Sequence, residues 1–282
     1  MSFSILNNIP SLEAQNSLAL TQFNLQNTLI QLSTGSRINS GSDDAAGLAI
    51  ADGLHANETA LNQSVNNISD GVGKLQVADG ALSQVTTLLD RAVTLATEAA
   101  NGLVTSTQAT ALDNEFSKIK AEITNIGNNT TFNGSSVFSA STTSVFISDA
   151  SSNYSITVSI AGLSAGAIAA SSASGLTAVS LTSDSLTSAS SASSALSDIN
   201  SAIINVASKR GEIGAVVNQL QAASNVANTQ LQNLTSAEDN IRAANVAQVI
   251  GNLSRYNILN QTGISALGQA NASQQAVLGL LR

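Results

Sequence analysis

The sequence predicts a mainly α-helical chain: a long antiparallel coiled-coil helical hairpin with a small β-hairpin region and two terminal assembly helices. Three observations support this fold class. Apolar residues recur three and four positions apart over most of the chain, which is the period of an α-helix. Only 3% of the residues are aromatic, so Leu, Ile, Val and Ala must fill the core, which favours thin helical bundles. Strand-like alternation of apolar and polar residues occurs only between residues 145 and 160.

The charge balance excludes several kinds of partner. The formal net charge is −8 and the 10 Lys and Arg residues are scattered, whereas binding a phosphate backbone needs basic residues gathered on one face. We therefore expect no nucleic-acid partner. No apolar stretch approaches the roughly 20 residues of a membrane-spanning helix, so we expect no membrane span. Without cysteine, the chain has neither a disulfide nor a thiol nucleophile.

Residues 1–41 are predicted to form an N-terminal coiled-coil assembly helix. Residues 1–36 carry one charge, Glu13, and their apolar residues fall on two faces of a helix. One stripe runs through Ile5, Ile9, Leu12, Phe23 and Ile30, and the other through Leu18, Leu25, Leu29 and Leu32. A surface helix needs one apolar face, so two such faces imply two neighbours. We expect other copies of the chain to supply them.

The stretch 32–54 is predicted to separate two long helices. Its Ser, Thr, Gly and Asn residues favour a turn that ends the first helix. Ser42 is expected to cap the second helix, while Asp43 and Asp44 place negative charge at its positive end. The alternative role for the two aspartates is a metal or acid/base pair. We adopt the capping interpretation because no His or Cys follows until His55.

Residues 42–138 are predicted to form the N-terminal part of a helical core domain. A long helix should run from Ala45 to about Gly102. Its apolar seam is expected at Leu61, Val65, Ile68, Val72, Leu75, Ala78, Leu82, Val85, Leu89, Ala92 and Ala96. This spacing, with one phase shift, is typical of a coiled coil. A second helix is expected from about Thr107 to Ile126, and its apolar face comprises Leu112, Phe116, Ile119 and Ile123.

Residues 139–187 are predicted to hold a β-hairpin and a Ser/Thr-rich variable surface segment. The alternating apolar residues are Val145, Ile147, Tyr154, Ile156, Val158 and Ile160, with turn-forming residues at 149–153. Residues 161–195 are mainly Ser, Ala, Gly and Thr, so we expect residues 161–187 to lie on the surface and to contribute little to the core. Two interpretations stay open for this segment: a loosely ordered surface, or a patch that carries O-linked glycans on its hydroxyl groups.

Residues 188–236 are predicted to form the C-terminal part of the helical core domain. An unbroken heptad seam runs through Leu196, Ile199, Ile203, Val206, Arg210, Ile213, Val217, Leu220, Ser224, Ala227, Leu231 and Leu234. Arg210 is expected to fix the register or to cap the edge of this seam.

Residues 237–282 are predicted to form a C-terminal coiled-coil assembly helix. It has no charge from 256 to 281. Its apolar residues include Leu253, Ile264, Leu267, Leu278 and Leu281.

Features of an enzyme are missing from the sequence. It contains no Cys, a single His and no phosphate-binding loop or metal-ligand spacing. His55, close to Asp52 and Glu58, is interpreted as a surface residue of a helix. We therefore expect neither an enzymatic activity nor a cofactor.

Three segments resemble bacterial flagellin, the filament subunit of the flagellum. They are LSTGSRINSGSDDAAGLAIADGL at 32–54, TTFNGSSVF at 130–138 and SAEDNIRAANVAQVIGNLSRYNILNQTGISALGQANASQQAVLGLLR at 236–282. Together with their flanks, residues 1–138 and 205–282, they occur in the order that the family has. The resemblance implies a short flagellin without the large outer domains.

The resemblance also implies a function. The terminal helices would pair into an inner coiled-coil tube, with Arg37, Asp43 and Asp44 among the assembly residues, and the middle helices would form the outer wall of an extracellular homopolymer used for swimming. Expected partners are an export chaperone, the filament cap and hook-associated proteins. Residues 1–15 lack the charge pattern and apolar core of a cleavable signal peptide, so export through the type III channel of the flagellum is implied.

The chain departs from the family at two places. Where the family has an acidic Ile-x-Asp-Ala-Asp-x-Ala stretch, residues 241–247 read IRAANVA, and both acids are missing. In the family's innate-immune receptor epitope, Asp90 replaces a Gln, whereas Arg91 and Glu115 match.

Two other classes of function compete with the filament subunit. The first is a hook-filament junction or another type III exported structural protein, and the second, more distant, is a soluble enzyme. Filament formation by the purified chain alone would favour the filament subunit. A requirement for a second protein would favour the junction, and turnover of a substrate would favour an enzyme.

Overall fold

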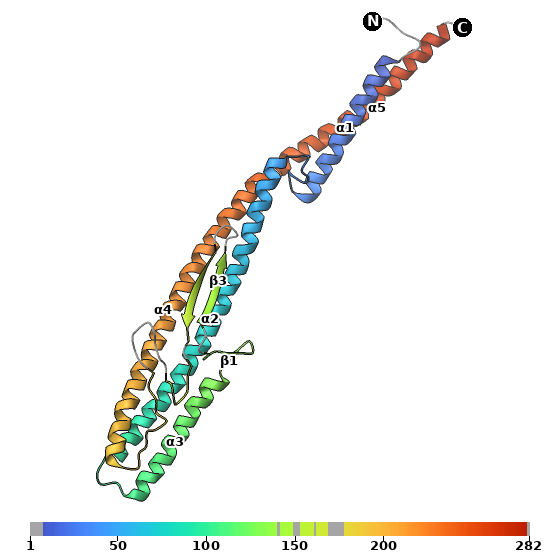
Figure 1. The fold of residues 1–282 in the computed structure, drawn as a ribbon. Helices are drawn as coiled ribbons and strands as arrows, with labels where there is room; N and C mark the ends of the chain where they lie inside the picture. The colour runs from blue at the N-terminus through green and yellow to red at the C-terminus, as the bar shows by residue number, and fades with distance from the viewer. Residues whose placement is uncertain (1–7, 140–141, 149–152, 161, 169–177, 281–282) are drawn as a thin grey trace. The chain divides into compact units, whose positions relative to one another are not determined.

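A computed structural model of the chain describes residues 8–139, 142–148, 153–160, 162–168 and 178–280. The helices are α1 (Ile9–Thr34), α2 (Ala45–Ala99), α3 (Ser106–Asn129), α4 (Ala189–Arg242) and α5 (Val246–Leu280) (Figure 1). The strands form two antiparallel hairpins, β1 (Thr131–Phe132) with β2 (Ser135–Ser136) and β3 (Thr142–Ser148) with β4 (Asn153–Ser159). The predicted mainly α-helical class is confirmed. The chain divides into unit 1, residues 1–56 and 233–282, and unit 2, residues 57–232.

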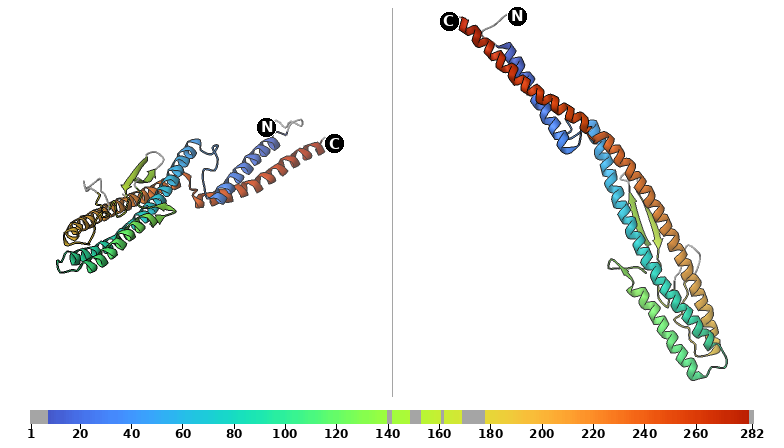
Figure 2. Two further views of the ribbon diagram at one scale, coloured as in Figure 1. Left: turned by 60° about the horizontal axis from the view of Figure 1, so that its bottom comes forward. Right: turned by 180° about the vertical axis from the view of Figure 1, so that it is seen from behind.

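In unit 2, α2 and α4 lie side by side and antiparallel (Figures 1 and 2). The predicted seam of α2 is buried at Leu61, Ile68, Leu75, Ala78, Leu82, Val85, Leu89, Ala92 and Ala96. Val65 and Val72 are half-buried at its edge. The helical hairpin and the phase of its first arm are therefore confirmed.

The seam of α4 is shifted from the predicted one. Ile199, Val206, Ile213, Leu220 and Ala227 are buried as expected. The further buried positions are Ala192, Ala195, Ala202, Asn205 and Lys209, whereas the predicted Leu196, Ile203 and Arg210 are half-buried. The larger Leu196 and Ile203 pack against the rim of the core, and the small Ala195 and Ala202 take buried positions.

Arg210 caps the edge of the seam, one of the two roles expected for it. Its Nε and Nη2 lie 2.7 Å and 3.3 Å from the two carboxylate oxygens of Asp79 on α2. This contact with Asp79 raises the pKa of the Arg210 guanidinium. The pair links the two arms of the helical hairpin at their rim.

Helix α3 begins with a capping box and buries its predicted apolar face. The Thr105 side chain accepts the Gln108 N–H, and the Gln108 side chain accepts the Thr105 N–H. Phe116, Ile119 and Ile123 are buried as predicted. The sequence pattern missed the β1–β2 turn that follows, although Asn133-Gly134 is a strong hairpin signal, with φ of 50° and 73°.

The predicted β-hairpin is confirmed as β3–β4, and its inner face packs on the helices. Val145, Ile147, Ile156 and Val158 are buried. Strand β3 is fastened to α2, because the Ser64 Oγ accepts the Ser148 N–H at 2.8 Å and the Asn67 Nδ2 donates to the Phe146 carbonyl at 3.1 Å. These contacts occupy backbone groups of β3 that a sheet edge would otherwise leave unpaired. Of the predicted turn at 149–153, residues 149–152 lie outside the described residues, and Asn153 is the first residue of β4.

The expectation that residues 161–187 contribute little to the core is wrong for their described parts. Leu163, Ile168, Leu181 and Leu186 are all buried. Polar contacts with the helices fix the same segments, namely Leu186 N–H to Asp113 Oδ1 at 2.7 Å, Lys120 Nζ to the Asp184 carbonyl at 2.7 Å, and Ala165 N–H to Thr124 Oγ1 at 3.1 Å. These apolar residues stand singly among Ser and Ala and show no helical or strand period. Their burial could therefore not be predicted from the sequence. Residues 169–177 lie outside the described ones, and the glycan patch stays a prediction.

Candidate assembly surfaces

In unit 1, helix α1 presents large apolar side chains to the outside. They are Ile9, Leu12, Leu20, Phe23, Leu29, Ile30 and Leu32. Phe23 leaves 61% of its surface exposed. The buried residues of this helix are the polar Ser11 and Thr28. A helix stabilised within its own unit would bury its apolar stripe, whereas α1 exposes it.

Helix α5 lies against α1 and has the same pattern (Figure 1). Its exposed apolar residues are Val246, Ile250, Ile258, Leu259 and Ile264. Among its described side chains, Val249 is the one that is buried. The helices touch closely at Gly263, where an added Cβ would lie 3.1 Å from Leu18 Cδ1. A surface hollow of about 200 Å³, lined by Leu18, Leu259 and Gly263 among others, lies beside this contact.

The predicted assembly residues of these helices fall on the exposed surface or at its edge. Ile9, Leu12, Phe23, Ile30 and Ile264 are exposed. Leu253 and Leu267 are half-buried. Ile5 and Leu281 lie outside the described residues, as does the side chain of Leu278. The role of all these residues in assembly stays a prediction.

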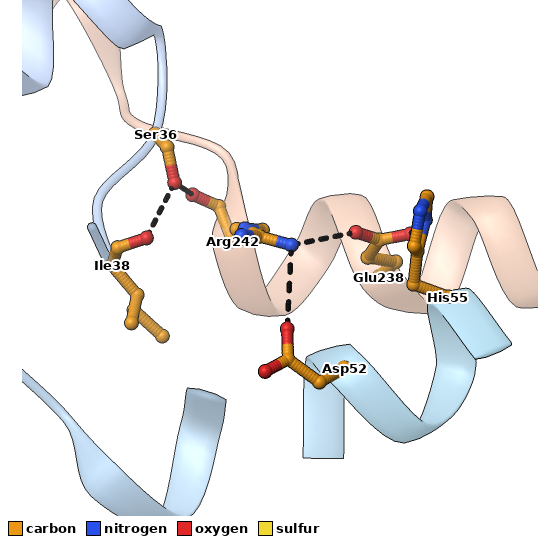
Figure 3. Close-up of polar contacts among 6 residues, drawn as sticks. All are labelled: Ser36, Ile38, Asp52, His55, Glu238 and Arg242. Atoms are coloured by element: carbon orange, nitrogen blue, oxygen red, sulfur yellow. Dashed lines mark hydrogen bonds and ion pairs between the residues drawn. The ribbon is translucent and has the colours of Figure 1, made fainter. Parts of the chain in front are cut away.

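The loop between α1 and α2 is held by the break between α4 and α5, and we call this contact the loop clamp (Figure 3). Its hydrogen bonds run from Arg37 N–H to the Arg242 carbonyl (2.7 Å), from Arg37 Nη2 to the Ile241 carbonyl (2.7 Å), from Ser36 Oγ to the Arg242 carbonyl (3.1 Å) and from Ala244 N–H to the Gly35 carbonyl (2.9 Å). Gly35 ends α1 in the left-handed conformation, with φ of 68°. The predicted assembly residue Arg37 thus fixes the path of the chain between helices of unit 1.

Side chains of unit 1 surround the clamp with polar contacts (Figure 3). Arg242 Nη1 lies 3.2 Å from Glu238 Oε1 and 3.7 Å from Asp52 Oδ1, and His55 Nδ1 lies 3.5 Å from Glu238 Oε2. The His55 side chain is 65% exposed, which confirms its predicted surface position. The pair of Arg242 with Asp52 is 36% and 63% exposed, and exposed ion pairs contribute about 0–1 kcal/mol, so we ascribe most of the clamp to the hydrogen bonds to backbone groups.

The cap of α2 is Asp44, and the prediction that Ser42 caps this helix is wrong. Asp44 directly precedes the first helical residue, Ala45, and its Oδ1 accepts the Gly47 N–H at 2.9 Å. The Ser42 hydroxyl instead lies 2.7 Å from the Ser40 hydroxyl. Ser42 is too far from the helix start to reach its free amides. The predicted capping role of Asp44 is confirmed.

Asp43 stabilises the preceding loop rather than the helix. Its Oδ2 accepts the N–H groups of Asn39 at 3.0 Å and of Ser40 at 2.9 Å, and the Ser40 hydroxyl at 3.1 Å. The hydrogen bonds from Asn39 and Ser40 lower the pKa of the Asp43 carboxyl. The carboxylate therefore holds the loop next to the clamp in a turn.

We expect this turn to loosen in acid. Because the pKa of Asp43 is lower in the folded chain than in the unfolded one, its stabilisation is complete above about pH 4 and disappears as the pH falls through the lowered value. The Asn39 and Ser40 amide resonances should therefore shift in an NMR titration below about pH 4. In Asp43→Asn, which keeps an acceptor but no titrating group, these shifts should be absent. Equal shifts in both proteins would contradict the assignment.

The two candidate receptor-epitope residues lie together in unit 2. Arg91 Nε on α2 and Glu115 Oε1 on α3 are 2.7 Å apart, and their side chains are 53% and 45% exposed. The hydrogen bond to Arg91 lowers the pKa of Glu115. The geometry pairs the residues on an accessible surface, and their recognition by a receptor stays a prediction.

Comparison with known proteins decides the family. The family model for the bacterial flagellin N-terminal helical region matches residues 5–143. The model for the bacterial flagellin C-terminal helical region matches residues 196–281. Flagellins of Halalkalibacterium halodurans and Bacillus subtilis are each 32% identical to the chain, with 99% of both chains covered in each comparison. This chain belongs to the bacterial flagellin family. A flagellar filament 33 kDa core protein of Treponema phagedenis is also similar, 29% identical over 99% of both chains.

Because the chain is a flagellin, the break between α4 and α5 can be compared with the pattern of the family. The break carries Ala243 and Asn245 where the family has two acids. Asn245 retains a cap for α5, since its Oδ1 accepts the Gln248 N–H at 3.2 Å. Among the described helices of this family member, none is both long and apolar enough to cross a membrane.

Proposed function

We propose that the chain is a structural subunit that polymerises with copies of itself into the extracellular filament of a bacterial flagellum, used for swimming. The observation that carries this proposal is the exposed apolar surface of α1 and α5 in unit 1. Complete burial of one such side chain contributes about 1.5–3 kcal/mol, so copies that cover this surface gain a large free energy of association. The family and the names of its members support the same function.

The decisive experiment is negative-stain electron microscopy of the purified chain. We expect the chain to form helical filaments without any second protein. Filaments that appear only after addition of a hook-associated protein would instead favour the junction protein.

We expect α1 and α5 to be largely unfolded in the monomer and helical in the polymer. Ordering the backbone costs about 1–2 kcal/mol per residue, and these helices bury few apolar side chains among those described. Hydrogen exchange should find residues 9–34 and 246–276 unprotected before assembly and protected afterwards, while α2–α4 of unit 2 stay protected throughout. Strong protection of both terminal helices in the monomer would contradict this expectation.

The export route and the further partners rest on the resemblance to the family. The chain would leave the cell through the type III channel of the flagellum, with an export chaperone, and meet hook-associated proteins and the filament cap outside. A strain without the flagellar export apparatus should retain the chain in the cell. Secretion from that strain at the normal level would contradict the proposed route.

Recognition by an innate-immune receptor is a second candidate function, favoured by the exposed pair of Arg91 and Glu115. Asp90 stands where the family epitope has Gln. Asp90→Gln should therefore increase receptor signalling, and Arg91→Ala should decrease it. Equal signalling by both variants and the unmodified chain would show that the receptor does not recognise the surface around Arg91 and Glu115.

A further inference from the structure

Unit 2 contains two Asn-Gly dipeptides, Asn101-Gly102 after α2 and Asn133-Gly134 in the turn between β1 and β2. An asparagine followed by glycine is chemically reactive, because glycine has no Cβ to keep its backbone nitrogen away from the side-chain amide. The two dipeptides are identical in sequence but differ in their hydrogen bonds. The structure therefore allows their reactivity to be compared.

The reaction in question is deamidation, which needs water but no enzyme. The Gly nitrogen gives up its proton to a base, bonds to Cγ of the preceding Asn and expels Nδ2 as ammonia, which leaves a five-membered succinimide ring. Water then opens this ring at one of its two carbonyls. Opening at the side-chain carbonyl gives aspartate. Opening at the main-chain carbonyl gives isoaspartate, in which the main chain runs through the side-chain carbonyl. Either product adds a negative charge.

Asn133 and Gly134 present both reacting groups. The Asn133 side chain is exposed, and no hydrogen bond from another described residue holds it. Gly134 is exposed too, and no heavy atom beyond its chain neighbours lies within 4 Å of a Cβ added there. In a two-residue turn the closing hydrogen bond joins the flanking residues, here Phe132 and Ser135. The Gly134 N–H therefore takes no part in the hairpin ladder and is available.

Asn101 is also exposed, but its own turn holds its side chain. Its Oδ1 accepts the Leu103 N–H at 3.3 Å, and its carbonyl accepts the Val104 N–H at 3.1 Å. The first of these bonds has to break before the side chain can rotate its carbonyl carbon toward the Gly102 nitrogen. A hydrogen bond of ordinary strength slows such a step by about fivefold. We therefore expect Asn133 to react faster than Asn101.

Isoaspartate at position 133 does not fit the β1–β2 turn. The turn has φ of 50° at Asn133 and 73° at Gly134, both positive, as a type I′ turn requires. Isoaspartate adds a methylene carbon to the main chain, so the two-residue loop no longer holds Phe132 opposite Ser135. Aspartate, the other product, forms the same turn as asparagine. Because Phe132 packs against the core of unit 2, only the isoaspartate product disturbs this packing.

We propose that Asn133 is a site of covalent modification, where deamidation through a succinimide gives aspartate and isoaspartate and the isoaspartate opens the β1–β2 hairpin. The reagent is water and the leaving group is ammonia. The proposal needs neither a partner nor a polymer, so it is independent of the proposed function.

Incubation of the purified chain at mildly alkaline pH tests the modification. The probe for isoaspartate is an isoaspartate-specific carboxyl methyltransferase with labelled S-adenosylmethionine, and mass spectrometry of a digest locates each product. Peptides with residue 133 should accumulate both products about fivefold faster than peptides with residue 101. The control is Asn133→Gly, which removes the reacting amide and keeps the turn, since Gly-Gly also forms a type I′ turn. This variant should lose most of the methyl label. Faster reaction at residue 101, or equal label in the variant, would overturn the proposal.

Hydrogen exchange tests the effect on the hairpin. The Val137 N–H donates to the Thr130 carbonyl at 3.0 Å, next to the β1–β2 pair. Its protection should be lost in the isoaspartate form and kept in freshly purified Asn133→Asp, which carries the same charge without the additional main-chain carbon. Equal protection in the two proteins would show that isoaspartate leaves the hairpin closed, and would overturn this part of the proposal.

Discussion

The double variant Phe23→Asp with Ile264→Asp should form no filaments. Both side chains are large, apolar and more than half exposed in unit 1, at 61% and 56%. If copies of the chain cover them, each substitution buries an unpaired carboxylate at a cost of several kcal/mol. The cost recurs in every subunit, so even high protein concentration should not restore assembly. Sedimentation and electron microscopy measure the result.

The matched control is Phe23→Leu with Ile264→Leu, which changes shape but adds no charge. It should polymerise with a modest increase in critical concentration. Thermal unfolding of unit 2 should be the same in both double variants, because residues 23 and 264 belong to unit 1. Normal filaments from the aspartate variant would show that these side chains lie outside the subunit interface.

Gly127→Ala should produce the largest loss of stability among single methyl additions in unit 2. The added Cβ would overlap the carbonyl oxygen of Leu163 and lie 2.7 Å from its carbonyl carbon, which are backbone atoms that cannot rotate away. Overpacking of this kind costs about 1–3 kcal/mol or more, whereas Ala in a helix is normally favoured over Gly by about 1 kcal/mol. The free energy of unfolding should therefore fall, against the propensity of the helix.

Gly80→Ala in α2 is the control, because no heavy atom other than the neighbouring backbone of its own helix lies within 4 Å of the added Cβ. It should raise the free energy of unfolding by about 0.5–1 kcal/mol. Urea denaturation followed by circular dichroism measures both variants. A fall in the free energy of unfolding for Gly127→Ala and a rise for Gly80→Ala would support the close approach of Leu163 to α3. A rise for both variants would contradict it.

Sequence patterns predicted the structure best where bulky apolar residues repeat. The seam of α2 from Leu61 to Ala96 and the face of α3 around Phe116 were predicted because Leu, Ile, Val or Phe occupies most of their positions at helical spacing. The rotation of the α4 seam was not, since Ala195 and Ala202 are as common on helix surfaces as in seams. Residues 162–168 and 178–188 were misjudged for a different reason: four buried apolar residues among Ser and Ala show no period.

The candidate assembly surfaces also include one part that the sequence predicted and one part that it did not. The exposed apolar residues of α1 and α5 were visible as two stripes on nearly uncharged segments. The loop clamp was not, because Arg37 contacts carbonyl groups, which every residue has and which therefore leave no mark in a sequence. Arg37 was included through the resemblance to flagellin alone.

The loop clamp has a consequence for how the sequence of the helix break can drift. Arg37 and Ser36 bind the main chain of residues 241 and 242, so substitutions that leave the path of this backbone unchanged leave the clamp unchanged. The two missing acids are therefore changes that the break can absorb: Ala243 still supplies its backbone, and Asn245 still caps α5. The side chain of Arg37 is constrained instead, since a shorter side chain at position 37 could not reach the Ile241 carbonyl. The side chains of the helix break are thus free to change, whereas residue 37 has to remain long.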